Sequence, residues 1–508
     1  MNRTTLSLAA AVTALAAVTG FAALTTPGAD AGTPTVAKAP ARLPVERSSL
    51  LCPAPSNSEV AETVYTSFTP AGEGEGGGQA ELKPSAATAD ETTADPKKAS
   101  TAKKAPAADK SVLSLAQPGK PVSAEADGGD APALVGSASG RLAPGWTTQQ
   151  TTKVPAGGSR GLLGVSCTAP DTDFWFPGAS TATQRADYVH LTNPDDTATV
   201  VDIELYGPDG ALKSQLTEGV TVPARSSVPV LLSTLTTDPA AEDVTVHATT
   251  RSGRVGAVVR SADEKLGSDW LPASADPAGT LVLPGIPADA TSVRLVAYAP
   301  GEDDADLKIQ LASPTGTITP AAAESLHVKS GMTAAVDLKD VTRGEAGSLL
   351  LSPAQKGRAA PVVAALRVVR GKGESQEVAF IPATGPVGER ATAADNRAKG
   401  TTLSLTAPGE AAEVKVTASA GTEGGTPATK TYTVKAGTTL AVTPPVPAGL
   451  KGSYALTVET VSGGPVHAAR TLAEPDDDIP MFTVQTLADD RGTVEVPTAR
   501  QDLSVLGG

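Results

Sequence analysis

The sequence predicts an all-β fold of tandem immunoglobulin-like β-sandwich domains, and two observations carry this prediction. Related nine-residue segments begin at Val222, Val328 and Val434, so a unit repeats every 106 residues. A repeat of about 100 residues is the size of one β-sandwich. Apolar residues also alternate with polar ones in matching stretches of the three copies, which is the period of a half-buried strand. These stretches are Val201/Ile203/Leu205, Leu307/Ile309/Leu311 and Val414/Val416/Ala418.

The first 31 residues have the features of a secretory signal peptide. Arg3 precedes a run of apolar and small residues from Leu6 to Leu24, and Ala29-Asp30-Ala31 offers a cleavage site. The run is also close to the length of about 20 residues that a membrane helix needs, so an uncleaved N-terminal anchor is the alternative. Either interpretation places the rest of the chain outside the cytoplasm.

The chain has two cysteines, Cys52 and Cys167, and each ends a short apolar run that is typical of a strand. In an oxidising compartment a single pair of this kind predicts a structural disulfide. The four histidines are scattered one to a strand-like segment, so no metal site is predicted.

We expect an N-terminal β domain over 42–180 and three β-sandwich repeats over 181–285, 286–393 and 394–508. Residues 71–110 are dominated by Gly, Glu, Ala, Lys and Thr, with Leu82 as the one large apolar residue, and we predict a disordered insertion there. Trp270 and Phe380 begin related segments that close a repeat, and Trp175-Phe176-Pro177 is interpreted as the same closing element. Each repeat is expected to own its core and to fold alone.

Charge and motifs exclude several function classes. Lys and Arg total 41, Asp and Glu total 55, and the net charge of −14 comes with no basic stripe for nucleic acid. The acidic turns, such as Glu302–Asp306, lack the ligand spacing of a calcium loop. Gly72–Gly77 matches a dinucleotide fingerprint, but no strand precedes it, and we predict no cofactor.

One segment fits a catalytic motif. Gly157-Gly158-Ser159-Arg160-Gly161 matches G-x-S-x-G, which needs a strand before the serine and a helix after it. The flanking residues predict a loop between two strands instead. We therefore predict no catalytic residue and keep a serine hydrolase as the least favoured alternative.

The three tryptophans, Trp146, Trp175 and Trp270, are the candidate ligand-contact aromatics. Exposed rings among them would indicate a glycan-binding accessory protein of the cell wall. Core packing is the favoured interpretation, because large apolar residues are usually buried.

Several segments resemble an uncharacterised family of secreted actinobacterial proteins. They are RLPVERSSLLCP near the start, GLLGVSCTAPDTDFWFPGAS, YVHLTNPDDTATVVDIELYGPDG, and GRVGAVVR followed by DWLP and LVLPG. The resemblance implies export and a two-cysteine design, and it brings no residue roles.

Taken together, these features predict a non-catalytic scaffold or interaction protein that is secreted or held at the cell envelope. Its expected partner is an envelope protein or a glycan, and nucleic acid is not expected.

Overall fold

The computed structural model describes residues 41–72, 76–88, 103–104, 110–321, 323–355 and 357–496. The predicted signal peptide or anchor over 1–31 lies outside the described residues. The chain forms two units, Met1–Leu43 with Glu495–Gly508, and Pro44–Val494. Strands β1 (Ala41–Pro44) and β40 (Thr493–Val496) form a two-stranded sheet.

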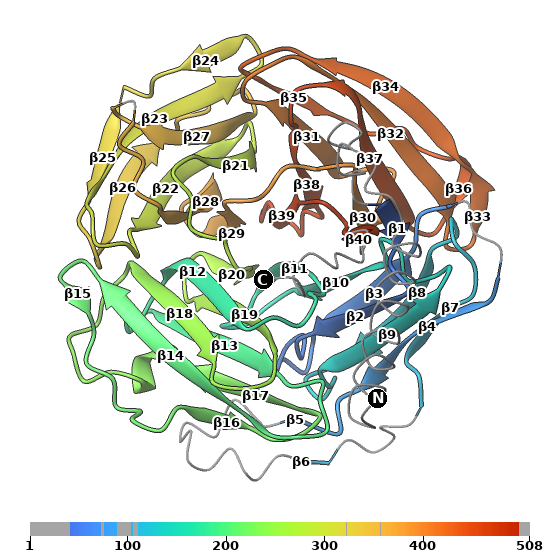
Figure 1. The fold of residues 1–508 in the computed structure, drawn as a ribbon, viewed down its shortest axis with the longest axis horizontal. Helices are drawn as coiled ribbons and strands as arrows, with labels where there is room; N and C mark the ends of the chain where they lie inside the picture. Colours follow the sequence, from blue (N-terminus) through green and yellow to red (C-terminus); the bar gives the residue numbers. More distant parts are fainter. Residues whose placement is uncertain are drawn as a thin grey trace, which may run out of the picture. The chain divides into compact units, whose positions relative to one another are not determined.

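The unit Pro44–Val494 is all-β, as the sequence predicts, and consists of four sandwiches with one strand order (Figure 1). Its described helical content is a single 3₁₀ turn at Leu232–Thr234. No helix in the described part of the chain is long and apolar enough to cross a membrane. In each sandwich one sheet contains the first strand and the other contains the last strand; we call them the first-strand sheet and the last-strand sheet.

The N-terminal sandwich and repeat 1 show the shared order. In the N-terminal sandwich the first-strand sheet is β2 (Arg47–Cys52), β9 (Leu134–Gly140), β4 (Gly78–Pro84), β7 (Leu113–Leu115), and the last-strand sheet is β11 (Gly161–Ser166), β10 (Thr147–Val154), β3 (Glu62–Phe68), β8 (Val122–Asp127). In repeat 1 the first-strand sheet is β12 (Asp173–Ala179), β18 (Val244–Thr250), β14 (Thr199–Gly207), with β15 (Gly210–Ala211) and β16 (Val220–Val222) beside β14, and the last-strand sheet is β20 (Gly267–Leu271), β19 (Gly256–Asp263), β13 (Arg185–Thr192), β17 (Ser226–Leu231). Strands β5 (Ala87–Thr88) and β6 (Lys103–Lys104) extend this last sheet beyond β17.

Repeats 2 and 3 follow the same order. In repeat 2 the first-strand sheet is β21 (Leu281–Ile286), β27 (Gly347–Pro353), β23 (Ala305–Ser313), with β24 (Gly316–Ile318) and β25 (Ser325–Val328), and the last-strand sheet is β29 (Ser375–Pro382), β28 (Val363–Lys372), β22 (Ala290–Tyr298), β26 (Thr333–Lys339). In repeat 3 the first-strand sheet is β30 (Arg390–Asn396), β37 (Tyr454–Gly463), β32 (Ala412–Gly421), with β33 (Gly424–Thr426), β36 (Ala448–Lys451) and β34 (Ala428–Val434), and the last-strand sheet is β39 (Phe482–Leu487), β38 (His467–Ala473), β31 (Thr401–Ala407), β35 (Thr438–Val442).

The last strands of the four sandwiches contact one another in sequence. Strand β11 contacts β20, β20 contacts β29, β29 contacts β39, and β39 contacts β11 again. The contacts between sandwiches therefore form a closed cycle, in which the N-terminal sandwich adjoins both repeat 1 and repeat 3.

The cores of the sandwiches are not equally separate. The alternating residues of β14, β23 and β32 are buried, as the sequence predicts. The core of repeat 1 extends to Val378 and Phe380 of repeat 2, and the core of repeat 2 extends to Phe482 and Val484 of repeat 3. The core of the N-terminal sandwich, by contrast, contains none of the described residues of the repeats.

The predicted disulfide is confirmed: Cys52 and Cys167 are bonded to each other, and no cysteine is free. Cys52 ends β2 and Cys167 follows β11, so the bond joins the two sheets of the N-terminal sandwich.

The prediction of disorder over 71–110 is wrong for Gly78–Pro84. These residues form β4, which pairs with β7 and β9, and Ala80 and Leu82 are buried. A strand that buries two side chains needs little apolar composition, which is why composition missed it. Residues 73–75, 89–102 and 105–109 of this segment lie outside the described residues.

The segments interpreted as closing elements have two different roles. Trp175-Phe176-Pro177 lies in β12, which pairs with β18 of repeat 1 and begins that sandwich, whereas Trp270 lies in β20, a last strand. The counterpart of β20 in the N-terminal sandwich is β11. The predicted boundaries at 285/286 and 393/394 consequently fall inside β21 and β30.

Candidate functional site: a buried charge cluster at the closing junction

The three tryptophans are all buried, at 5% exposure for Trp146, 8% for Trp175 and 1% for Trp270. The Trp146 indole donates to Ser67 Oγ at 2.8 Å. The Trp175 ring stacks on His247 with 3.6 Å between centroids. None of the three rings is exposed for a ligand, and all three are buried in the interior, as large apolar side chains usually are. The glycan-binding alternative depended on an exposed tryptophan, so we do not pursue it.

Ser159 lies in a turn between β10 and β11. A strand follows it where the nucleophile motif requires a helix. The described residues also contain no group of three or more His, Cys, Asp or Glu side chains that could hold a metal ion.

The side chains that stand out lie instead where the N-terminal sandwich meets repeat 3, which we call the closing junction. Their placement starts from a β-bulge in the first strand of repeat 3. Asp395 has a φ of 58° there, and the register of β30 shifts between Ala393 and Asn396. The corresponding bulges of β12 and β21 have Gly178, with a φ of 97°, and Gly285, with a φ of 89°.

Glycine is the usual residue at such a position, because a left-handed backbone brings a Cβ close to the following carbonyl oxygen. Asp is among the few others that adopt this conformation. Repeat 3 therefore places a carboxylate where repeats 1 and 2 have no side chain.

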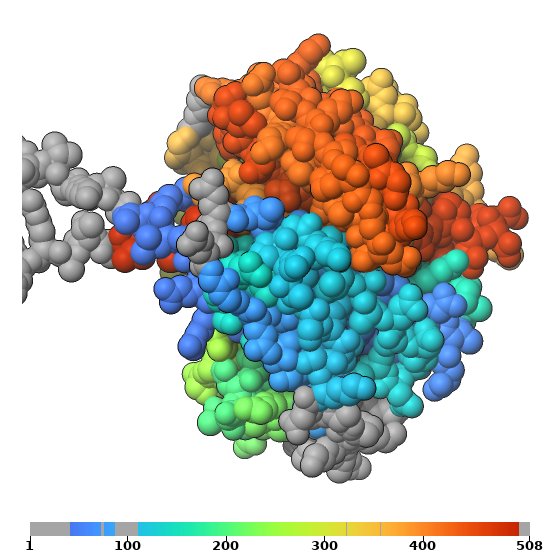
Figure 2. Space-filling view, turned by 90° about the vertical axis from the view of Figure 1, so that its right-hand side faces the viewer, coloured from blue at the N-terminus to red at the C-terminus, as the bar shows by residue number. Residues whose placement is uncertain are grey.

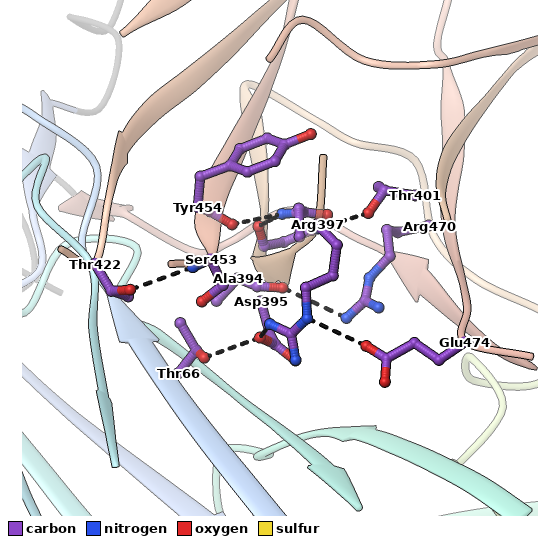
Figure 3. A network of polar contacts seen from close by, with 12 residues as sticks. Thr66, Ala394, Asp395, Arg397, Thr401, Thr422, Ser453, Tyr454, Arg470 and Glu474 are labelled. Atoms are coloured by element: carbon purple, nitrogen blue, oxygen red, sulfur yellow. Dashed lines mark hydrogen bonds and ion pairs between the residues drawn. The ribbon is translucent and has the colours of Figure 1, made fainter. Parts of the chain in front are cut away.

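Asp395 is buried and joins two sandwiches (Figure 3). The Thr66 hydroxyl, on β3 of the N-terminal sandwich, donates to its Oδ1 at 3.2 Å. The Arg397 guanidinium donates to the same oxygen, and its Nε donates to Glu474 Oε1 at 3.1 Å. Asp395 Oδ2 has no protein hydrogen-bond partner among the described residues.

A second arginine lies in the same cluster, fully buried. Arg470, on β38, donates to the Ala394 carbonyl oxygen at 3.4 Å, while its Nε and Nη1 have no protein partner in the described part of the chain. Burial lowers the pKa of Arg470 to about 10, although the Asp395 carboxylate acts in the opposite direction. Burial also lowers the pKa of Arg397. The Asp395 and Glu474 carboxylates raise that pKa by more, so its net shift is upward.

Two arginines and two carboxylates therefore balance in charge at this cluster. The cluster therefore holds the two sandwiches together by charge. Removing one partner of a buried ion pair would leave the other charge uncompensated and would destabilise the junction.

Further contacts cross the closing junction. Lys153 of β10 pairs with Asp476 at 3.2 Å between Nζ and Oδ1. Two small apolar clusters also cross it: Phe68 packs with Ala394 and Ala455, and Leu162 packs with Leu472 and Met481. Figure 2 shows the N-terminal sandwich (blue to cyan) and repeat 3 (orange) lying side by side.

Buried carboxylates also tie the four last strands together. Glu377 of β29 accepts from the Leu162 backbone N–H at 3.1 Å, and its Oε2 lies 3.6 Å from Arg160 Nη2. Burial raises the pKa of Glu377 to about 8. Asp269 of β20 accepts from the Gly164 N–H and from the Thr483 hydroxyl, both at 3.0 Å, and burial raises its pKa well above the usual value.

Sequence reasoning missed Asp395, Arg397, Arg470, Glu377 and Asp269. One signal could have identified Asp395: Ala394-Asp395 occupies the place of Pro284-Gly285 and Pro177-Gly178 in the other repeats. The remaining four lie in ordinary strand patterns and meet only through the tertiary fold.

The model of one protein family, described as a family of unknown function (DUF5719), matches residues 122–445. A search of curated proteins finds no match.

Proposed function

Since the chain belongs to the DUF5719 family, whose function is unknown, we propose a role from the structure itself: a non-catalytic scaffold that acts outside the cytoplasm. The observation that carries the proposal is the way in which the four sandwiches are joined. Buried polar bonds and apolar contacts fix each sandwich against its neighbours, so surface loops of different sandwiches keep fixed spacings. Fixed loops on a rigid framework are typical of binding surfaces.

The compartment is part of the proposal. An intramolecular disulfide within the N-terminal sandwich supports an oxidising location. The apolar segment Leu6–Leu24 and the resemblance to secreted actinobacterial proteins support export by a signal peptide or tethering by an N-terminal anchor. The expected partner is an envelope protein. A fusion of residues 1–40 to an export-dependent reporter tests the compartment, and a reporter that stays inactive argues against export.

A capture experiment tests the scaffold role. Residues 32–508 serve as bait on solubilised envelope, beside an Asp395→Ala bait and a Lys339→Gly bait. Asp395→Ala removes the carboxylate that accepts from Thr66 and Arg397 and so weakens the closing junction, whereas Lys339 is exposed in repeat 2, also with a left-handed φ of 55°. We expect one partner to be enriched by the parent and by Lys339→Gly and to be lost with Asp395→Ala, because binding depends on the arrangement of the sandwiches.

The hydrolase alternative has its own test. A fluorophosphonate probe should leave the parent chain unlabelled. Labelling that disappears in Ser159→Ala would replace the scaffold proposal with a hydrolase.

A further inference from the structure

The N-terminal sandwich is joined to the rest of the chain in a different way from the three repeats. The apolar cores of repeats 1 and 2 run on into the next repeat. The N-terminal sandwich has its own core and its own disulfide. Its apolar contacts with its neighbours are separate small clusters, beside the buried bonds of Leu162 to Glu377 and of Gly164 to Asp269. Towards repeat 1, Leu163 and Val165 pack with Val258 and Trp270; towards repeat 3 lie the clusters of the closing junction.

One short crossing connects this sandwich to repeat 1. Strand β11 ends at Ser166 and β12 begins at Asp173. Within the crossing, the Thr168 backbone bonds to Leu51 of the N-terminal sandwich, and the Asp171 backbone bonds to Val255 of repeat 1. The chain can therefore pivot at Ala169-Pro170 without breaking the strands on either side.

The closing junction also contains buried polar groups that the described protein residues do not satisfy. Gln149 Oε1 and Thr151 Oγ1 of β10, both polar side-chain atoms of Gln485 on β39, and Asp395 Oδ2 are buried without a protein partner in the described residues. Each unsatisfied buried polar group typically costs about 1–3 kcal/mol. No peptide bond crosses between the N-terminal sandwich and repeat 3, so separation there breaks only non-covalent contacts.

From these observations we propose that the N-terminal sandwich exchanges between two copies of this chain. After a pivot at Ala169-Pro170, it docks between repeats 1 and 3 of a second copy and receives that copy's N-terminal sandwich in return. The exchanged pair re-forms the same contacts, among them Thr66–Asp395, Lys153–Asp476 and the pairing of β5 with β17. Domain swapping exchanges an identical element between two copies and is a low-cost route to dimers, and short hinge loops invite it. The partner surface is thus a second copy of the same chain, and the proposal does not depend on the scaffold role.

Cross-linking between chains tests the exchange directly. Lys153→Cys and Asp476→Cys are made on separate chains; the native cysteines are bonded to each other, so each variant has one free thiol. The two chains are incubated together at high concentration, diluted, and treated with a short bis-maleimide. We expect a covalent heterodimer, because only an exchanged pair brings position 153 of one chain to position 476 of the other.

The controls decide between exchange and closure within one chain. Each single variant alone should give only trace dimer, and the Lys153→Cys/Asp476→Cys double variant should cross-link within one chain when dilute. Asp395→Ala in both partners should speed heterodimer formation several-fold, whereas Lys339→Gly should leave it unchanged. Intrachain cross-linking of the double variant with no heterodimer on mixing would overturn the proposal. So would a double variant that does not cross-link at all, because the contacts of the closing junction would then be absent.

Discussion

At the scale of single residues, the sequence least predicts the role of Asp395, which has a left-handed backbone and bonds to a second sandwich. The β-bulge is common to the first strands of the three repeats, but Asp395 supplies a carboxylate where Gly178 and Gly285 supply none. The cost of the left-handed backbone is offset by bonds to Thr66 and Arg397. The same residue therefore shapes a strand and joins two sandwiches.

Asp395→Gly should destabilise the chain even though glycine suits the backbone better. The change relieves roughly 1 kcal/mol of left-handed strain, but it leaves Arg397 and Arg470 short of a counter-charge, which costs about 3–5 kcal/mol. The midpoint of guanidinium unfolding should therefore fall. Lys339→Gly removes an exposed left-handed side chain in repeat 2 and should leave that midpoint unchanged or slightly raised. An equal change of the unfolding midpoint in the two variants would show that the charge cluster contributes nothing to stability.

Glu377 should make stability depend on pH. Its pKa is about 8 in the folded chain against an ordinary value of 4.5 for a glutamate, so the folded state holds the proton more tightly than the unfolded state. The stabilisation is complete below about pH 4.5 and is lost as pH rises to about 8. Glu377→Gln imitates the protonated side chain and keeps an acceptor for the Leu162 N–H. We expect this variant to have a higher melting temperature than the parent at pH 9 and the same one at pH 4.5.

Thermal melts by circular dichroism at several pH values test this expectation. The matched control is Glu374→Gln, an exposed change in the same hairpin. A parent and a Glu377→Gln variant with parallel pH profiles would rule out Glu377 as the source.

At the scale of elements, the period of the sequence predicted most of the strands and their inward faces. The alternation of Val201, Ile203 and Leu205 is local information, and a half-buried strand must display it. Strand β4 was not predicted, because it buries only Ala80 and Leu82 in a segment of low complexity. The contacts between last strands were not predicted for another reason. Glu377 and Leu162 lie 215 residues apart, and no local sequence pattern predicts a contact over that separation.

Leu82→Ala tests whether β4 belongs to the N-terminal core. The side chain is fully buried, and truncation of a buried leucine typically costs about 2–5 kcal/mol. Limited proteolysis should then release the N-terminal sandwich first, while the repeats stay protected. The neighbouring Lys83→Ala, whose side chain is partly exposed, should behave like the parent. Unchanged proteolysis of Leu82→Ala would restore the prediction that this segment is disordered.

At the scale of the whole molecule, the repeats are less independent than their regular spacing suggests. Buried residues of repeat 2 complete the core of repeat 1, and buried residues of repeat 3 complete the core of repeat 2. The N-terminal sandwich, which the sequence distinguishes by its cysteines and its insertion, has a described core of its own and contributes no residue to the described core of a repeat. The regular spacing thus predicts the length of a repeat but not how much buried surface the repeat shares with its neighbour.

Fragments of repeat 2 test this sharing. Residues 279–384 contain all of β21 and β29 but expose Val378 and Phe380, so the fragment should fold with a lower melting temperature than the parent and bind a hydrophobic dye. Residues 286–393 lose Leu281 and Leu283 from the core and should show no cooperative melt. A cooperative, dye-free melt of 286–393 would establish the repeats as independent domains.

The pairing of Thr66 with Asp395 has a consequence for the order of events during synthesis. These residues are 329 positions apart, and a ribosome adds about 5–20 residues per second. Thr66 is therefore synthesised roughly 16–66 s before Asp395, on the basis of that rate. Export also delivers a chain from its N-terminus, so the order of emergence is the same outside the cytoplasm. Until repeat 3 of the same chain emerges, the face bearing Thr66 and Gln149 is open to repeat 3 of a second copy, and this order favours the exchange.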